Sequence, residues 1–291
     1  MICPVCNHPE YSKLLTVKDF TVSAENFEIV ECTSCRFRFT AHPPAPDQIG
    51  RYYQSDAYIS HTDSKKGIFN TIYQLIRKQA VASKRKLVTQ YSHRQTGQLL
   101  DYGCGTGAFL VEMKSAGWQV QGMEPDPGAA SRAAELTTSL ISHPDQLSTL
   151  PSNAFNVVTM WHVLEHVHDL HGTLAQVKRI LKEDGILIVA VPNHRSFDAR
   201  QYAAHWAAYD VPRHLHHFNP DSLSTLMQMH SMTITDVKPM WYDAFYVSLL
   251  SEKYKTGSMR LIPALLTGII SNINAIFKKG VCSSQIYIIR S

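Results

Sequence analysis

Short apolar segments alternate with longer segments of helical periodicity through the middle of this 291-residue chain. Apolar runs predict strands near residues 99–100, 119–123, 155–160 and 185–191, and helical spacing predicts helices over 109–116, 128–136 and 170–181. Two more strand patterns lie at 233–237 and 285–289. Alternation of this kind favours an α/β fold, in which helices cover both faces of a parallel sheet.

The pattern divides the chain into a short head and a larger domain. A proline-rich stretch at residues 42–46 is typical of a stiff linker. We therefore expect a head and linker over residues 1–46 and one domain over residues 47–291. Residues 64–91 contain no proline and carry apolar side chains at helical spacing, which predicts a long helix before the first strand of the sheet.

Residues 241–280 form an insertion that is long for a connection between two strands. It opens with aromatic residues, including Trp241, Tyr242 and Tyr246, and continues with an apolar stripe of helical period over 261–273. Such a stripe packs on its own domain, on a second chain or on a membrane surface. The nearly uncharged polar face argues against a membrane, because surface helices usually carry basic residues there. We expect a helical cap over the substrate site, with the three aromatic side chains as its wall.

Four of the six cysteines form two CxxC pairs in the head. The pairs are separated by 25 residues and consist of Cys3, Cys6, Cys32 and Cys35. Paired thiolates at this spacing supply four soft ligands for tetrahedral zinc. A head of about 40 residues buries too little apolar surface to fold alone, so metal binding would supply its folding free energy. We predict a zinc ribbon whose ion is structural, because all four ligands come from the protein.

Composition and charge narrow the function further. With 44% hydrophobic and 18% charged residues the chain is globular, which excludes a disordered or fibrous protein. The net charge of +4 is too small to indicate nucleic acid as a partner, although residues 64–94 hold eight Lys or Arg and no acid. Residues 1–50 hold four basic and six acidic side chains, a poor surface for phosphate backbones. The cysteine usage and the absence of a leader-like start predict a cytoplasmic protein.

A glycine-rich loop at residues 101–108 follows a predicted strand and opens a helix, as nucleotide-binding turns do. The loop contains the dinucleotide pattern G-x-G-x-x-A, with Gly103 and Gly105 as its first glycines. Asp101 argues against a pyrophosphate, because a carboxylate repels phosphate and attracts the ammonium group of a methionine moiety. Glu124 ends the next strand, where a carboxylate can accept both ribose hydroxyls. The two acids favour S-adenosylmethionine over a nicotinamide dinucleotide.

The order of motifs over residues 99–193 resembles the class I S-adenosylmethionine-dependent methyltransferases. The matching stretches are the glycine-rich loop and residues 122–126, 155–158, 164–167 and 181–193. This resemblance implies a Rossmann-like, doubly wound sheet of seven strands. It also implies a set of cofactor contacts, made by Asp101, Gly103, Gly105, Glu124, Pro125, Asp145, Gln146 and Trp161.

Histidines gather in two segments of the chain. Residues 162–166 read H-x-x-E-H, an inverted zinc-peptidase signature, but their place after a strand whose neighbouring loops hold a nucleotide argues against a peptidase. Some quinol O-methyltransferases bind a divalent ion here, with an acid where this chain has His162. Residues 212–218 resemble the small-molecule branch that includes quinol and sugar methyltransferases. Since imidazole titrates near neutrality, we predict His214 as the base or acceptor-positioning residue, with His162 facing the same pocket.

The predicted reaction is methyl transfer from S-adenosylmethionine to a small-molecule acceptor, at a phenolic or sugar-like hydroxyl or at carbon. Alignment and exclusion of water would supply most of the catalysis. Two alternatives remain: an RNA methyltransferase with a zinc-binding head that recognises RNA, and a catalytically inactive binding protein of the same fold. Tyr52, Tyr53 and Tyr58 either close over the cofactor or pack as core aromatics. The sequence predicts neither the acceptor nor the oligomeric state.

Overall fold

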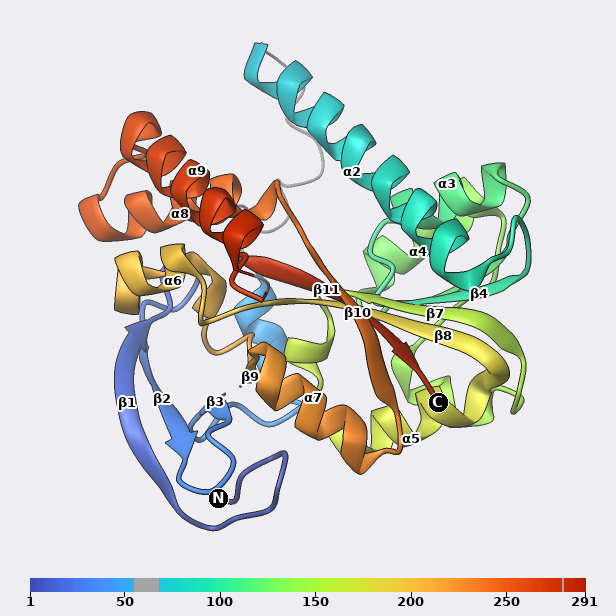
Figure 1. Cartoon of the computed structure of the whole chain (residues 1–291), viewed down its shortest axis with the longest axis horizontal. Coiled ribbons are helices and arrows are strands. Elements are labelled where there is room, and N and C mark those ends of the chain that lie inside the picture. The colour runs from blue at the N-terminus through green and yellow to red at the C-terminus, as the bar shows by residue number, and fades with distance from the viewer. Residues whose placement is uncertain (55–67, 279) are drawn as a thin grey trace.

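A seven-stranded sheet forms the centre of the protein, with the strand order β10-β11-β8-β7-β4-β5-β6 (Figure 1). The computed structural model describes residues 1–54, 68–278 and 280–291, and only the backbone of residues 68–77. Tyr58 therefore lies outside the described residues. The strands are β4 (Gln98–Tyr102), β5 (Gln119–Met123), β6 (Ile141–Ser142), β7 (Phe155–Trp161), β8 (Leu181–Pro192), β10 (Thr233–Pro239) and β11 (Ser284–Arg290).

One strand runs against the other six, so the predicted seven-stranded α/β sheet is a mixed one rather than a purely parallel one. Strands β4 to β8 pair in parallel, whereas β11 is antiparallel to both β8 and β10. Antiparallel neighbours need no crossover between them. The connection from β10 to β11 can therefore leave the sheet and return at the same end. Residues 241–280 make up most of that connection.

Helices cover both faces of the sheet, as the alternating pattern predicts. Strand β8 shows why: Leu187, Val189 and Val191 belong to one hydrophobic cluster, and the intervening residues 186, 188 and 190 belong to the other. The α-helices are α2 (Ile68–Ser92), α3 (Ala108–Ser115), α4 (Pro127–Thr137), α5 (Leu170–Ile180), α6 (Phe197–Tyr202), α7 (Pro220–Met229), α8 (Asp243–Thr256) and α9 (Leu261–Phe277). Helices α2, α3 and α4 pack on one face, and α5 and α7 pack on the other (Figure 1).

The head forms a second, antiparallel sheet in which the larger domain supplies one strand. Strands β1 (Tyr11–Lys18), β2 (Asn26–Cys32) and β3 (Arg38–Thr40) come from the head, and β9 (His216–His217) pairs with β3. A buried Arg213 side chain donates to Asp19 of the head at 3.0 Å and to Asp210 at 2.6 Å. The segment that carries His214 is therefore fastened to the head on both sides.

Several connections between these elements contain short 3-10 helices. They are η1 (Ile49–Tyr53), η3 (Pro144–Thr149), η4 (Leu164–His166), η5 (Ala203–His205) and η6 (Ala207–Tyr209). None of the helices in the described ranges combines the length and the apolar character that crossing a bilayer requires.

Candidate active site

The glycine-rich loop leaves the carboxyl end of β4, where the chain turns to β5 on one side and β7 on the other. Open α/β sheets bind ligands at such a switch point. Gly103 has φ +78°, and an added Cβ would lie 2.4 Å from Val163. Gly105 has φ +52°, yet nothing lies within 4 Å of the position of its Cβ. The first glycine is thus needed for packing, and the second presents bare backbone to open space where a ligand can approach.

Asp101 holds a buried carboxylate at this end of β4. Its Oδ1 accepts a hydrogen bond of 2.6 Å from the Thr159 hydroxyl. Burial raises the pKa of Asp101 to about 7, while the hydrogen bond from Thr159 and the positive charge of Lys84 act in the opposite direction. A bound cation would favour the ionised form of this carboxyl group, because opposite charges attract. The ammonium group of S-adenosylmethionine is such a cation.

Glu124 bridges the glycine-rich loop and the start of α4. One carboxylate oxygen accepts from the N–H of Gly105 at 2.8 Å, and the other accepts from the N–H of Asp126 at 3.0 Å. Each oxygen keeps a second lone pair, so the carboxylate can still accept two hydroxyl groups of a ribose. Burial raises the pKa of Glu124, and these two N–H donors oppose the rise.

Trp161 ends β7, two residues after the partner of Asp101 in the sheet, and carries a buried indole N–H with no hydrogen-bond partner among the described residues. Lys84 of α2 places its ammonium group 4.4 Å from the centre of the indole ring, and Phe109 packs edge-on against the same ring. Burial lowers the pKa of Lys84, which Asp101 and Asp243 counteract. An unsatisfied buried donor at a loop with open space points to a ligand acceptor at this place.

The remaining predicted cofactor contacts lie along the same edge of the sheet. Pro125 follows Glu124 and is exposed, and Asp145 and Gln146 are exposed on η3, directly after β6. His143 contacts the Asp145 carboxylate at 3.1 Å. The structure brings these residues to one rim, and their contacts with a cofactor stay a prediction.

His162 lies between two carboxylates rather than alone in a pocket. Its Nε2 is 2.9 Å from Asp243 at the start of α8, and its Nδ1 is 3.3 Å from Glu165. Burial opposes a charge on this ring, but the two carboxylates outweigh burial and raise the pKa of His162 to about 10. His162 is therefore an imidazolium near neutral pH, and it ties the helical insertion to the loop after β7.

Glu165, His166 and His214 form an acceptor cluster, in which one ligand atom of each lies within 4.8 Å of the others. His166 Nδ1 faces the Arg213 carbonyl at 3.0 Å, and His214 Nδ1 faces the Ala208 carbonyl at 2.9 Å. His166 Nδ1 also lies 3.0 Å from the Tyr53 hydroxyl. Because a carbonyl only accepts, Nδ1 of His214 carries the proton and its Nε2 presents a lone pair.

The third member of this cluster, Glu165, is fully buried, and its Oε2 has no hydrogen-bond partner among the described residues. Burial and the neighbouring His214 lower the pKa of His166 to about 4, so this ring is neutral. The unpartnered Glu165 oxygen and the lone pair of His214 can take up a proton from a hydroxyl group or bind a cation.

Two residues of this region, Lys84 and Asp243, are absent from the sequence prediction. Each lies on a helix far from the motifs, and nothing in its local sequence marks it. This chain has His162 where the ion-binding quinol O-methyltransferases have an acid, and Asp243 places a carboxylate 2.9 Å from its Nε2.

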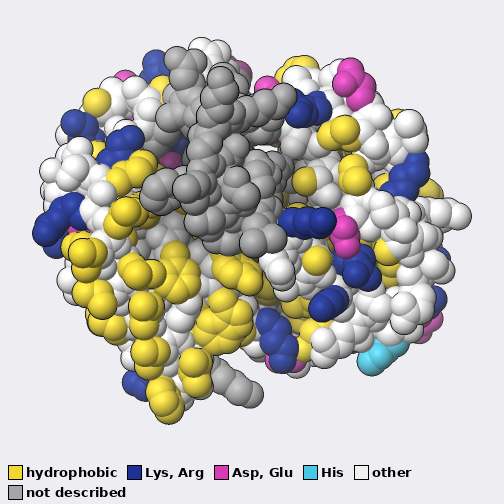
Figure 2. Space-filling view, turned by 90° about the horizontal axis from the view of Figure 1, so that it is seen from above, with side chains coloured by type: hydrophobic (Ala, Val, Ile, Leu, Met, Phe, Trp, Pro, Cys, Tyr) yellow, Lys and Arg dark blue, Asp and Glu magenta, His cyan; other side chains and the backbone are white. Residues whose placement is uncertain are grey.

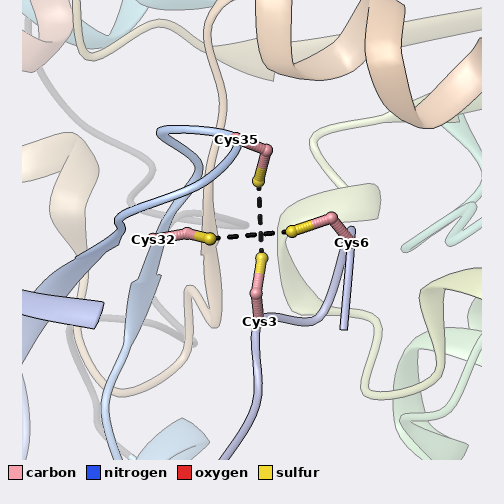
Figure 3. Close-up of side chains that lie close together, drawn as sticks. All are labelled: Cys3, Cys6, Cys32 and Cys35. Carbon is pink, nitrogen blue, oxygen red and sulfur yellow. Dashed lines mark hydrogen bonds between the residues drawn. The ribbon is translucent and has the colours of Figure 1, made fainter. Parts of the chain in front are cut away.

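The four head cysteines converge from two loops toward one point (Figure 3). The Sγ atoms of Cys3 and Cys35 are 3.6 Å apart, as are those of Cys6 and Cys32. These separations are too long for a disulfide bond. They match the edge of about 3.8 Å that a tetrahedron with zinc–sulfur bonds of about 2.3 Å requires. The cluster therefore fits a four-coordinate zinc ion.

A glycine-rich loop with an acid before its first glycine and a second acid ending the next strand, in a sheet of this strand order, defines a class I S-adenosylmethionine-dependent methyltransferase. The chain belongs to the methyltransferase domain family, whose model matches residues 59–235.

Curated relatives lie in the same class. A ubiquinone biosynthesis O-methyltransferase from Rhodopseudomonas palustris is 28% identical over 159 residues, which cover 50% of this chain and 62% of that protein. A protein of the same name from Bradyrhizobium diazoefficiens is 27% identical over 161 residues, with 51% and 63% covered. The chain thus matches less than two thirds of the length of these relatives.

Solved structures show the same fold. Magnesium protoporphyrin IX methyltransferase from Synechocystis PCC 6803 superposes with a TM-score of 0.55 at 13% identity, over 84% of this chain and 99% of that one. Geranyl diphosphate C-methyltransferase from Streptomyces coelicolor gives a TM-score of 0.51 at 16% identity, over 85% and 98%. At these identities the likeness concerns the fold alone.

Proposed function

We propose that the protein methylates a small-molecule acceptor that carries a phenolic or sugar-like hydroxyl group, with carbon as the alternative atom of attack. The observation that carries this proposal is the acceptor cluster of Glu165, His166 and His214, in which the buried Glu165 Oε2 has no hydrogen-bond partner among the described residues and His214 presents a lone pair at Nε2. A substrate hydroxyl supplies the missing donor. The ubiquinone O-methyltransferase relatives are named for transfer to oxygen, which agrees with a hydroxyl acceptor.

The bound cosubstrate supplies an electrophilic methyl group on sulfur. Asp101 and Glu124 hold its methionine and ribose parts, with the loop at Gly103 and Gly105 between them. His214 accepts the hydroxyl proton at Nε2 while the oxygen forms its bond to the methyl carbon and the carbon–sulfur bond breaks. The buried Glu165 carboxylate stabilises the imidazolium that results.

His162 takes a positioning role in this scheme. Because it already carries its proton, it cannot act as a base near neutral pH. Its contacts with Asp243 and Glu165 hold the start of α8 against the loop after β7. The aromatic wall at Trp241 and Tyr242 begins beside that contact, so the insertion is placed to cap the acceptor.

We also propose that the head binds one structural zinc ion through Cys3, Cys6, Cys32 and Cys35. All four ligands belong to the protein, which leaves no open position for chemistry. The ion would stiffen the small sheet that, through β9 and Arg213, holds the segment of His214.

Incubation with isotope-labelled S-adenosylmethionine and a panel of phenols, sugars and fractionated cell extract identifies the acceptor. With that acceptor, His214→Gln should lower turnover about 10²–10⁴-fold and leave cosubstrate affinity within twofold. His171→Gln, which alters a partly buried histidine at α5, serves as the matched control.

A loss of turnover below threefold in His214→Gln would remove the base from the scheme. Labelling of structured RNA, together with binding that weakens steeply with salt, would replace the small molecule by RNA. Cosubstrate binding without any labelled product would favour a catalytically inactive binding protein.

A further inference from the structure

Helix α9 is amphipathic, but its polar side packs against the protein and its apolar side faces the solvent. Its small and polar side chains are buried against the protein, namely Ala264, Thr267, Gly268 and Ser271. Its large apolar side chains point outward, with exposed fractions of 74% at Ile262, 66% at Ile276 and 83% at Phe277. The apolar stripe expected from the sequence therefore does not pack on the described part of its own domain.

Buried polar contacts fix this orientation. The Ser271 hydroxyl donates to Asp198 at 2.7 Å, and Asp198 also accepts from Trp206 and Ser283 at 2.7 Å. At Gly268 an added Cβ would lie 2.6 Å from Phe245 of α8, so only glycine allows the two helices to approach this closely. Rotation of α9 to hide its apolar face would break the contacts of Asp198, which is fully buried.

The exposed apolar face extends over both helices of the insertion (Figure 2). It comprises side chains that are all at least one third exposed, namely Trp241, Tyr242, Tyr246, Met259, Leu261, Ile262, Leu265, Leu266, Ile269, Ile270, Ile273, Ile276 and Phe277. Monomeric proteins rarely leave so many large apolar side chains together in water. Tryptophan and tyrosine at one border are typical of the boundary between lipid and water.

The charged residues around this apolar face are mainly basic, which indicates the kind of surface that it binds. Residues 261–277 contain no charged side chain, and Arg260 and Lys278 flank the helix. Lys253 and Lys255 end α8, while Glu252 on the same helix is buried. A second copy of this face would bring like charges together, whereas an anionic surface complements them. The uncharged polar face no longer argues against a membrane, because that face packs on the protein.

We propose that α9, with the start and end of α8, docks on the surface of a lipid bilayer that contains anionic headgroups. A helix of 17 residues is about 26 Å long and would lie along the interface, with its apolar side chains among the acyl chains and the basic residues at the headgroups. Asp243, which begins α8, contacts His162, so the docked surface adjoins the acceptor site.

Cosedimentation with vesicles tests this docking. The full-length protein should pellet with vesicles of phosphatidylcholine and phosphatidylglycerol, and less with phosphatidylcholine alone. The double variant Ile262→Glu, Leu266→Glu should lower the partition coefficient more than tenfold. The matched control is Leu136→Glu, Met229→Glu, which changes apolar side chains of similar exposure elsewhere and should bind like the parent. The double variant Lys253→Gln, Lys255→Gln should lower the partition coefficient on the anionic vesicles by about fivefold for each lysine removed.

Calorimetric binding of S-adenosylmethionine verifies that every variant is folded. Parent protein that stays in the supernatant with both vesicles overturns the proposal, as does equal pelleting of the α9 double variant. Light scattering without vesicles measures the oligomeric state and so tests whether the face binds a second copy of the chain instead. A parent dimer that the α9 variant dissociates, together with no vesicle binding, would assign this face to a second copy of the chain.

Discussion

At the scale of single residues, the Asp101 carboxylate decides which charge the glycine-rich loop accepts. It is buried, with one hydroxyl donor and the nearby Lys84 ammonium to offset the cost of its charge. A ligand cation completes that compensation, and a phosphate would oppose it. The selectivity of the loop therefore depends on one titratable group whose pKa lies near neutrality.

Asp101→Asn should weaken S-adenosylmethionine binding at pH 7.5 at least tenfold, because truncation of a buried charged contact costs about 2–5 kcal/mol. Since the pKa of Asp101 is about 7 without ligand, affinity in the parent should rise from pH 6 to pH 7.5 as the carboxyl ionises. The variant should lack this rise. Calorimetry measures both effects, with Asp184→Asn at an exposed ion pair as the control. A parent affinity that is constant over this range would contradict the assignment.

The residues that the sequence predicts at the site share a local signal. Asp101 and the glycines lie in one loop motif, and Glu124 ends the next strand of the chain, which pairs directly with β4, so the sequence order predicts that they lie close together. Lys84 and Asp243 reach the site from α2 and α8, and no local pattern marks a residue whose partner is distant in the sequence. The charged state of His162 was unpredictable for the same reason.

At the scale of elements, burial determined what the sequence could predict. All six strands that the sequence predicts are found near their predicted positions. Residues 185–191 of β8, for example, are buried throughout and form a continuous apolar run. The two-residue strands β6 and β9 are too short to leave a pattern. The apolar period of α9 predicts a helix, but periodicity cannot tell which medium the apolar side faces; the buried Asp198 and Ser271 decide that.

For the head, Cys32→Ser, Cys35→Ser should abolish a zinc content of about one equivalent per chain, since a tetrahedral site cannot persist with two ligands. Metal analysis of purified protein measures the content. Cys282→Ser removes a buried cysteine outside the cluster and should keep the metal. Parent protein that is folded and contains almost no zinc would refute the metal site.

At the scale of the whole molecule, neutral buried imidazoles link stability to pH. Burial lowers the pKa of His216 to about 4 and, with the nearby Arg38 and Arg195, that of His194 to about 3. Each ring uses Nε2 in a hydrogen bond, and its Nδ1 has no partner among the described residues. Protonation would therefore place an unsatisfied charged donor inside the protein.

The free energy of unfolding should fall as the pH decreases from about 6.5 to about 4. In that window the histidines bind protons in the unfolded chain but stay neutral in the folded protein. Acid therefore lowers the free energy of unfolding by up to about 3 kcal/mol for each imidazole. Urea denaturation at a series of pH values measures the slope. His216→Gln should reduce it and the exposed His93→Asn should not; a parent stability that is constant from pH 7 to pH 5 would rule out this linkage.

The pairing of β3 with β9 has a consequence for the order of assembly during synthesis. The four head cysteines lie within residues 3–35, whereas Thr40 and its partner His214 are separated by 174 positions. At about 5–20 residues per second, a ribosome needs on the order of ten seconds or more to cover that distance. The four cysteines can come together as soon as the head is synthesised, but β3 remains an open edge of its sheet until β9 is synthesised. The sheet of the head is thus completed only after residues 216–217 of the larger domain have been made.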